Sequence, residues 1–238
     1  AITDDDADNS LSAGESSTIT FTLSEASTDF VEADATVTGG ELSNWTAVSS
    51  TVYTAIFTPT ANSSTNAVIH VANDKFSDAA GNTNQDENDA NNTVTFTVDT
   101  TRPTIVITDD DADNSLSAGE SSTLTFTLSE AATDFVIGDI DVTGGTLSDF
   151  AGSGTDYTAT FTPATNSTTN GVIHVANDKF CDAAGNTNQD ETDANNTVTF
   201  TVDTTTSPTP DPSPTPHPSP NPKPSPTPDP PPTPPPPP

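Results

Sequence analysis

An internal repeat fills most of the chain and constrains the fold more than any other feature. Ile2 aligns with Ile107 at an offset of 105 residues, which falls to 104 after one deletion between Trp45 and Tyr53. The run TDDDADNSLSAGESS occurs unchanged in both copies. Because a period near 100 residues is too long for a solenoid repeat, each copy is predicted to be a complete domain.

Short runs in which apolar residues alternate with threonine predict strands. Ile19, Phe21 and Leu23 fall on one face of such a run, and threonine fills the opposite, solvent-facing side. No helical periodicity interrupts these runs. The first copy is predicted to hold seven strands, one around Ile2 and the others at 18–23, 35–38, 42–48, 52–58, 67–72 and 93–98.

Seven short strands in about 100 residues, separated by turn residues, are typical of an Ig-like β-sandwich. The cysteine pair and central tryptophan of antibody domains are missing. Trp45 is replaced by Phe150 in the second copy, which indicates an aromatic core plug rather than a platform for ligand stacking. The chain is therefore predicted to be all-β, with two tandem seven-stranded Ig-like β-sandwiches, module 1 at 1–103 and module 2 at 104–206.

A proline-rich segment follows at 207–238, where 19 of the 22 prolines lie. Consecutive prolines fix φ and remove backbone donors, so this third region is predicted to be a polyproline II stalk rather than a strand. Hydroxyl side chains between the prolines are candidate O-glycan sites, namely Ser213, Thr215, Ser219, Ser225 and Thr227.

The linker between the two copies is very short. Arg102 and Pro103 separate the last strand of the first copy from the first strand of the second. Neighbouring modules are therefore expected to touch and to form a semi-rigid pair.

The charge of the chain argues against nucleic acid as a partner. The net charge is −31, from 35 acidic residues against 4 Lys and Arg. Such self-repulsion destabilises a compact state unless cations neutralise it, and it argues against nucleic-acid binding. No apolar run approaches the ~20 residues of a membrane-spanning helix, so direct membrane insertion is not expected either.

A catalytic role is not expected. His70 and its copy His174 lie in the middle of a predicted strand, away from any nucleophile motif. An open acidic surface lacks the apolar pocket that would raise the pKa of one carboxyl of a pair. Cys181 replaces Ser77 of the first copy and is interpreted as a tolerated small residue rather than a reactive thiol.

The most specific motif is the twelve-residue loop that begins at Asp4 and ends at Glu15. It places carboxylates at positions 1, 3, 5 and 12, an apolar residue at 8, and at 6 an asparagine, which tolerates a left-handed backbone. Oxygen ligands at this spacing suit Ca²⁺. The alternative is that Leu11, Gly14 and Glu15 only build the turn into the next strand. The predicted ligands are Asp4, Asp6, Asp8 and Glu15, with Asp109, Asp111, Asp113 and Glu120 in the second copy.

A second acidic cluster surrounds Asp78 and, in the second copy, Asp182. If the last strand ends at the distal pole of its module, this loop lies at the proximal pole, where Asp182 would face Asp99 of the linker. The same pole is expected to hold Glu130, Asp134 and Asp139.

Four stretches carry a resemblance to a known family: LSAGESSTITFTLSEA, the segment 53–59, the motif 78–82 and the linker 98–103. They resemble the bacterial Ig-like repeats of large calcium-dependent cell-surface adhesins, and the resemblance covers both modules. In that family, acidic residues near module junctions hold Ca²⁺ and stiffen the array. The metal ligands implied by the resemblance are Asp99 and Asp182, and Asp78 is named with them because it occupies the matching position in module 1.

The tail is similar to the Ser-Pro and poly-Pro segments of hydroxyproline-rich glycoproteins in algal walls and flagellar surface fibres. Five Asn-x-Ser/Thr sequons permit N-glycosylation, although chance alone predicts about that many. They begin at Asn44, Asn62, Asn91, Asn166 and Asn195. The parent chain is expected to continue at both ends.

Three functions follow from these features. The favoured one is a non-catalytic, extracellular spacer of a large cell-surface adhesin, with its modules rigidified by Ca²⁺ and with other domains of the same chain as partners. The second is a subunit of an extracellular filament or mastigoneme-like fibre with a glycosylated polyproline axis, whose partners are other filament subunits. The third, a carbohydrate-binding accessory module with glycans as ligands, would need a row of exposed aromatic side chains.

Overall fold

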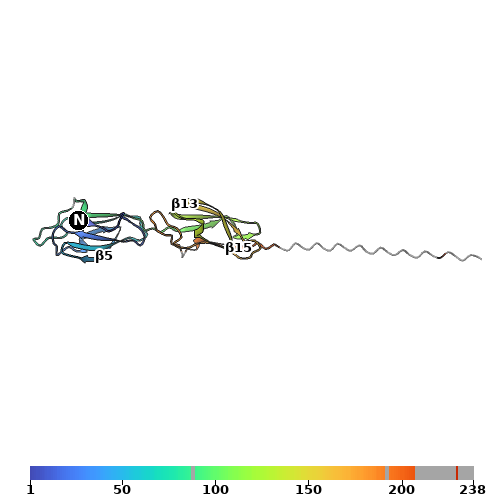
Figure 1. Ribbon diagram of the computed structural model, residues 1–238, viewed down its shortest axis with the longest axis horizontal. Helices are drawn as coiled ribbons and strands as arrows, with labels where there is room; N and C mark the ends of the chain where they lie inside the picture. Colours follow the sequence, from blue (N-terminus) through green and yellow to red (C-terminus); the bar gives the residue numbers. More distant parts are fainter. Residues whose placement is uncertain (87–88, 191–192, 207–228, 230–238) are drawn as a thin grey trace, which may run out of the picture. The chain divides into compact units, whose positions relative to one another are not determined.

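A computed structural model describes residues 1–86, 89–190 and 193–206, together with Asp229. Residues 1–206 form one compact unit, coloured from blue to orange in Figure 1. Apart from Asp229, the predicted polyproline II stalk lies outside the described residues, and so do the five O-glycan candidates.

Module 1 is a sandwich of two four-stranded sheets. Buried apolar side chains alternate with more exposed polar ones, as in β3, where Ile19 and Phe21 are buried. One sheet has the order β1-β3-β6-β5 and the other β2-β8-β7-β4. The strands are β1 (Ile2–Thr3), β2 (Ser10–Leu11), β3 (Ser17–Thr22), β4 (Ala35–Thr38), β5 (Gly40–Ala47), β6 (Val52–Pro59), β7 (Ala67–Val71) and β8 (Thr93–Val98).

Module 2 repeats this arrangement with the sheet orders β10-β15-β14-β12 and β13-β11-β9. One long strand, β13, replaces the separate β5 and β6 of module 1. The strands are β9 (Ile105–Asp109), β10 (Ser115–Ser117), β11 (Ser122–Ala132), β12 (Ile140–Thr143), β13 (Gly145–Pro163), β14 (Gly171–Val175) and β15 (Thr197–Asp203). Short 3-10 turns precede four strands: η1 (Glu32–Asp34), η2 (Ala90–Asn92), η3 (Ile137–Asp139) and η4 (Ala194–Asn196).

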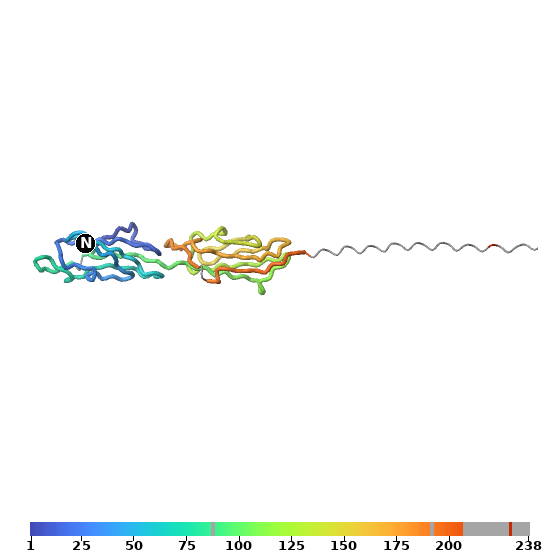
Figure 2. Tube along the Cα trace, turned by 90° about the horizontal axis from the view of Figure 1, so that it is seen from below, coloured from blue at the N-terminus to red at the C-terminus, as the bar shows by residue number. Residues whose placement is uncertain are grey.

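Each module has its own hydrophobic core. The core residues of module 1 fall within the sequence range Ile2 to Val98, and those of module 2 within Ile105 to Val202. The two cores share no residue. In Figure 2 the tube passes from module 1 to module 2 through a single connection. The repeat in the sequence is therefore a repeat of whole hydrophobic cores.

The structure confirms the predicted all-β fold of two tandem Ig-like sandwiches. Module 1, in its described residues 1–86 and 89–98, has one strand more than expected. This extra strand, β2, pairs in parallel with β8 and lies inside the acidic loop. Two residues are too few to show an alternating pattern. The predicted module boundaries after residues 103 and 206 stay predictions.

Candidate functional site

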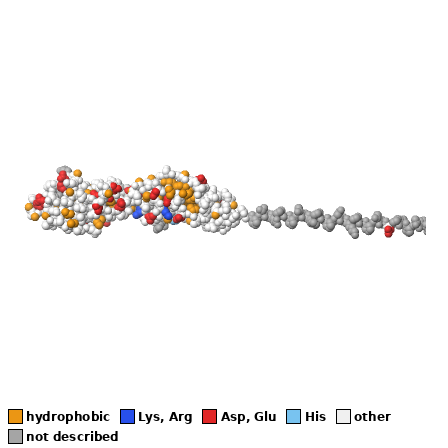
Figure 3. Space-filling model, in the orientation of Figure 1, with side chains coloured by type: hydrophobic (Ala, Val, Ile, Leu, Met, Phe, Trp, Pro, Cys, Tyr) orange, Lys and Arg blue, Asp and Glu red, His pale blue; other side chains and the backbone are white. Residues whose placement is uncertain are grey.

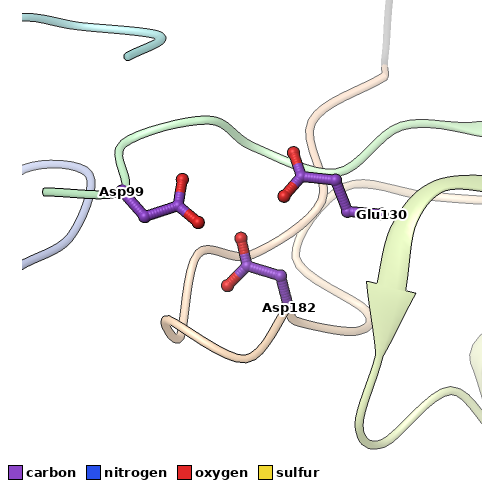
Figure 4. Close-up of side chains that lie close together, drawn as sticks. All are labelled: Asp99, Glu130 and Asp182. Atoms are coloured by element: carbon purple, nitrogen blue, oxygen red, sulfur yellow. The ribbon is translucent and has the colours of Figure 1, made fainter. Parts of the chain in front are cut away.

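Three carboxylates meet where module 1 joins module 2 (Figure 4). Asp99 directly follows β8, Glu130 lies near the end of β11, and Asp182 lies in the loop between β14 and β15. One oxygen atom of each carboxylate lies within 4.8 Å of the other two. Within residues 1–86, 89–190 and 193–206, no other group of three His, Cys, Asp or Glu side chains comes as close.

The cluster is partly removed from water. Asp182 is 4% exposed, and Asp99 and Glu130 are half-buried. Burial raises the pKa of the Glu130 carboxyl, and the charges of Asp99 and Asp182 raise it further. Three carboxylates this close together repel one another until a proton or a cation neutralises part of their charge.

Backbone and side-chain donors hold Asp182 in place. Its Oδ1 accepts hydrogen bonds of 2.9 Å from the N–H groups of Ala184 and Asn186. Its Oδ2 accepts a 2.8 Å hydrogen bond from Nδ2 of Asn186. The loop DAAGN therefore aims one carboxylate at the junction without using a cationic side chain.

Asn186 also crosses the junction. Its Nδ2 donates to the backbone oxygen of Asp99 at 3.0 Å, and its Oδ1 accepts from the N–H of Ala13 at 2.6 Å. A single amide of module 2 thus holds two separate loops of module 1, and it brings the Asp99 backbone next to Asp182.

The linker lies against module 2 as an extended segment. Arg102 Nη1 donates to the hydroxyl and the backbone oxygen of Thr187, at 2.9 and 3.2 Å. Further along the linker, the Pro103 oxygen accepts from the Gln189 N–H, and the Ile105 N–H donates to the carboxylate of Asp190. The modules are in contact, as the short linker predicts, and the single arginine at the junction is bonded to Thr187.

The donor set suits Ca²⁺. This ion takes six to eight oxygen ligands, which carboxylates supply singly or in pairs. Asp99 and Asp182 are both predicted ligands, and they meet at the predicted pole. Glu130 was expected at that pole but was not counted among the ligands, because the sequence does not show which side chains of a pole point toward the junction.

The other two carboxylates expected at this pole have different partners. Asp134 accepts the N–H and the thiol of Cys181, at 2.8 and 3.2 Å. Asp139 accepts the backbone N–H of Val136 at the start of η3. Asp139 thus stabilises a local turn, whereas Asp134 joins its loop to the loop that holds Cys181.

The carboxylates of the twelve-residue loop in module 1 bond mainly to their own loop. Asp4 accepts the N–H of Asp6, and Asp6 and Asp8 both accept the N–H of Ser10. Asn9 has a φ of 56°, which confirms the left-handed backbone expected at position 6. The described residues of this loop do not form a three-carboxylate group of the kind found at the junction.

The second copy of the loop has the same contacts. Leu11 and its counterpart Leu116 are buried in their cores, and Glu120 accepts the Ser117 N–H as Glu15 accepts that of Ser12. These contacts support the turn-building alternative. Calcium binding in these loops stays a prediction for Asp4, Asp6, Asp8, Glu15, Asp109, Asp111, Asp113 and Glu120.

Asp78 has the same local contacts as Asp182 but no linker carboxylate beside it among the described residues. It accepts the N–H groups of Ala80 and Asn82 and the Asn82 side-chain amide. The Asn82 side-chain hydrogen bond is the main cause that lowers the pKa of Asp78. The loop therefore has the same internal hydrogen bonds in both modules.

Cys181 takes over the structural role of its counterpart. Ser77 donates its hydroxyl to Asp29 at 2.6 Å, and Cys181 donates its thiol to Asp134 at 3.2 Å. The hydrogen bond to Asp134 is the main cause that raises the pKa of the Cys181 thiol. This disfavours the thiolate and supports the interpretation as a small residue replacing serine.

Aromatic and histidine side chains lie within the modules. Trp45 packs against Phe21 and Phe30, with ring centroids 5.1 and 5.2 Å apart, which confirms its place in the core. Tyr53 is buried in module 1, as is its counterpart Tyr157 in module 2. His70 and His174 each bond through Nδ1 to a threonine hydroxyl of the neighbouring strand.

The five sequon asparagines occupy exposed positions. Acidic side chains, red in Figure 3, are spread over the visible face of both modules, with few Lys or Arg between them. No helix of the described residues is long and apolar enough to cross a membrane.

Several solved structures of bacterial surface proteins are similar to parts of this chain. The solved structure of the Escherichia coli adhesin FdeC is 14% identical, with a TM-score of 0.47, over 85% of this chain and 63% of that one. Invasin, a bacterial integrin-binding protein, is 16% identical, with a TM-score of 0.37, over 85% and 39%. The Yersinia pseudotuberculosis adhesin InvE is 15% identical, with a TM-score of 0.32, over 84% and 58%. The chain thus spans less than two thirds of each of these structures.

No curated protein matches the chain. The model of the bacterial Ig-like domain matches it twice, at residues 2–96 and 99–201. These two matches cover each sandwich almost completely. The chain therefore belongs to the bacterial Ig-like domain family.

Proposed function

We propose that this chain is a non-catalytic, extracellular spacer of a cell-surface adhesin, in which Ca²⁺ bound at the junction holds the tandem modules in a fixed orientation. The observation that carries the proposal is the meeting of Asp99, Glu130 and Asp182. The match of both modules to the bacterial Ig-like domain family supports the cell-surface location, together with the sequence stretches that resemble adhesin repeats.

The ligands come from both sides of the junction. Asp99 directly follows β8, the last strand of module 1, whereas Glu130 and Asp182 belong to module 2. An ion bound by all three would therefore tie one module to the other. Burial, and then the charges of Asp99 and Asp182, raise the pKa of Glu130, and a divalent cation would oppose this by stabilising the ionised carboxyl.

Such an ion would bind at an interface that hydrogen bonds already hold together. Asn186 and the linker hold the modules together through hydrogen bonds, and the charge of the cluster opposes that contact. Calcium sites in extracellular modules have dissociation constants of about 10⁻⁴ to 10⁻³ M. The junction is thus expected to stiffen in extracellular calcium and to loosen in its absence.

Thermal unfolding with Ca²⁺ and with a chelator tests the proposal. Calcium at about 100 times its dissociation constant should stabilise the protein by ~2.7 kcal/mol. Glu130→Gln should lose most of this gain. The matched control is Glu25→Gln, because Glu25 is the exposed counterpart of Glu130 in module 1 and should leave the gain intact. A parent midpoint that does not respond to Ca²⁺ would exclude calcium from the junction.

The alternatives have less support in the described residues. A glycan-binding platform would need exposed aromatic rings, but Trp45, Tyr53 and Tyr157 pack in the cores. The filament subunit depends on the segment 207–238, of which only Asp229 is described.

A further inference from the structure

Module 1 has a groove at its N-terminal pole, the end that in module 2 receives the linker. Its volume is about 530 Å³, and it lies between the start of β1, the end of β3 and the loop that precedes β8. Ser24, Thr83, Gln85 and Asp86 line it, with the partly exposed ring of Phe76 at its side.

The counterparts of these four residues in module 2 bind the linker. Ser129, which matches Ser24, exchanges two hydrogen bonds of 2.8 and 2.9 Å with the backbone of Thr104. The other three partners follow in order along the linker. Thr187 accepts from Arg102, the Gln189 N–H donates to Pro103, and Asp190 accepts from the Ile105 N–H.

Burial follows the same division. Pro103 and Ile105 are buried against module 2, and there Phe180 is 1% exposed and Asp190 is 4% exposed. Their counterparts Phe76 and Asp86 are both partly exposed. Identical side chains thus line an open groove in one module and a filled one in the other.

We propose that the groove of module 1 is a docking site for an extended peptide segment of the type Arg-Pro-Thr-Ile, the linker of another module of this repeat. Thr83 would receive the arginine, the Gln85 N–H the proline carbonyl, and Asp86 the N–H of the β-branched residue. Ser24 would pair with the residue between them. Each contact copies one that the same residue type makes in module 2. The segment would extend β1 at its N-terminal end, where β9 begins two residues earlier than β1.

The proposal is tested by adding the sequence of residues 99–105, DTTRPTI, directly before Ala1 of the full chain. In this frame the added isoleucine takes the place that Ile105 has before Val106, the counterpart of Ala1. The matched control carries the same seven residues in scrambled order. All measurements are made with a chelator present, so that ion binding at the junction does not contribute and a failure of the calcium proposal does not affect the outcome.

Two readouts are expected to change together. The unfolding midpoint of module 1 should rise by about 5–10 °C, and hydrogen exchange at the Gln85 amide should slow at least about tenfold, toward the rate of Gln189. The scrambled extension should leave both at the parent values. Equal midpoints and equal Gln85 exchange in the two extended chains would overturn the proposal.

Discussion

The two modules have nearly the same sequence, yet their N-terminal poles are in different states. In module 2 the DAAGN loop is covered by the linker and by Ala13, and Asp182 and Asn186 are 4% and 2% exposed. In module 1 the same loop is less covered, and Asn82 is exposed. The residues of the two poles are nearly identical, and in module 2 the linker and Ala13 cover them. Substitutions at matched residues of the two poles therefore measure what the contacts at the junction contribute to the stability of module 2.

The largest difference is expected for the paired phenylalanines. Phe180→Ala should destabilise module 2 by about 3–5 kcal/mol, because it leaves a cavity under the linker. Phe76→Ala should destabilise module 1 by less than half of that, since the Phe76 ring is already partly exposed. Chemical denaturation, monitored by NMR signals that belong to one module or the other, gives the change in unfolding free energy of each module separately. Equal losses would mean that the linker adds nothing to the packing at this pole.

A smaller difference is expected for the paired asparagines. Asn186→Ala should weaken module 2 by about 1–3 kcal/mol, because the backbone groups of Ala13 and Asp99 and the Asp182 carboxylate lose a partner. Asn82→Ala should cost less, since Asn82 bonds to Asp78 at an exposed site. The unfolding midpoints of the two variants check this, and a more damaging Asn82→Ala would contradict the assigned role of Asn186.

The pH dependence without metal should also single out the junction. The pKa of Glu130 is raised in the folded protein, so the folded state binds the Glu130 proton more tightly than the unfolded state does. Its contribution to stability is therefore complete below the ordinary glutamate pKa and is lost as the pH rises through the raised value.

Glu130→Gln should remove that decline. Glu25→Gln should keep it, because Glu25 is exposed and lies outside the three-carboxylate cluster. The measurement is the unfolding midpoint against pH in chelator, taken as the difference between each variant and the parent. Carboxyls with lowered pKa values, such as Asp29, whose pKa is about 2, contribute the opposite slope, and the difference cancels them. A Glu130→Gln profile parallel to the parent profile would contradict repulsion at the junction.

The smallest effect is expected where the modules differ by one atom. Cys181→Ser gives module 2 a hydroxyl that can donate to Asp134, as the Ser77 hydroxyl donates to Asp29 in module 1. A hydroxyl bonds a carboxylate more strongly than a thiol does, so the variant should stabilise module 2 by about 0.5–1 kcal/mol. Thermal unfolding measures the gain, and a loss would show that the cysteine has a packing role of its own.

Sequence reasoning predicted the parts of the molecule that depend on local pattern. The alternation of apolar and polar residues predicted the strands around Ile19 and Phe96, and Asn9 predicted the left-handed backbone of the acidic loop. The short linker and the expected direction of the last strand predicted that Asp99 faces Asp182, and the two carboxylates lie close together.

The rest depends on contacts between residues far apart in the chain. β2 is too short for any periodicity, and its pairing with β8 joins residues more than 80 positions apart. Glu130 lies within β11, which extends to Ala132, whereas its counterpart Glu25 lies beyond the end of β3 at Thr22. The two poles have nearly the same sequence, so no local pattern could show that one of them is open.

The most direct measurement is the relative orientation of the two modules from residual dipolar couplings, recorded on the parent chain with Ca²⁺ and with a chelator. If Asp99, Glu130 and Asp182 bind one ion, both modules should fit a single alignment tensor in Ca²⁺. In chelator the two tensors should differ in magnitude, while each module keeps its own fold. Identical tensors under both conditions would contradict a calcium-held junction and would leave the linker and Asn186 as its only support.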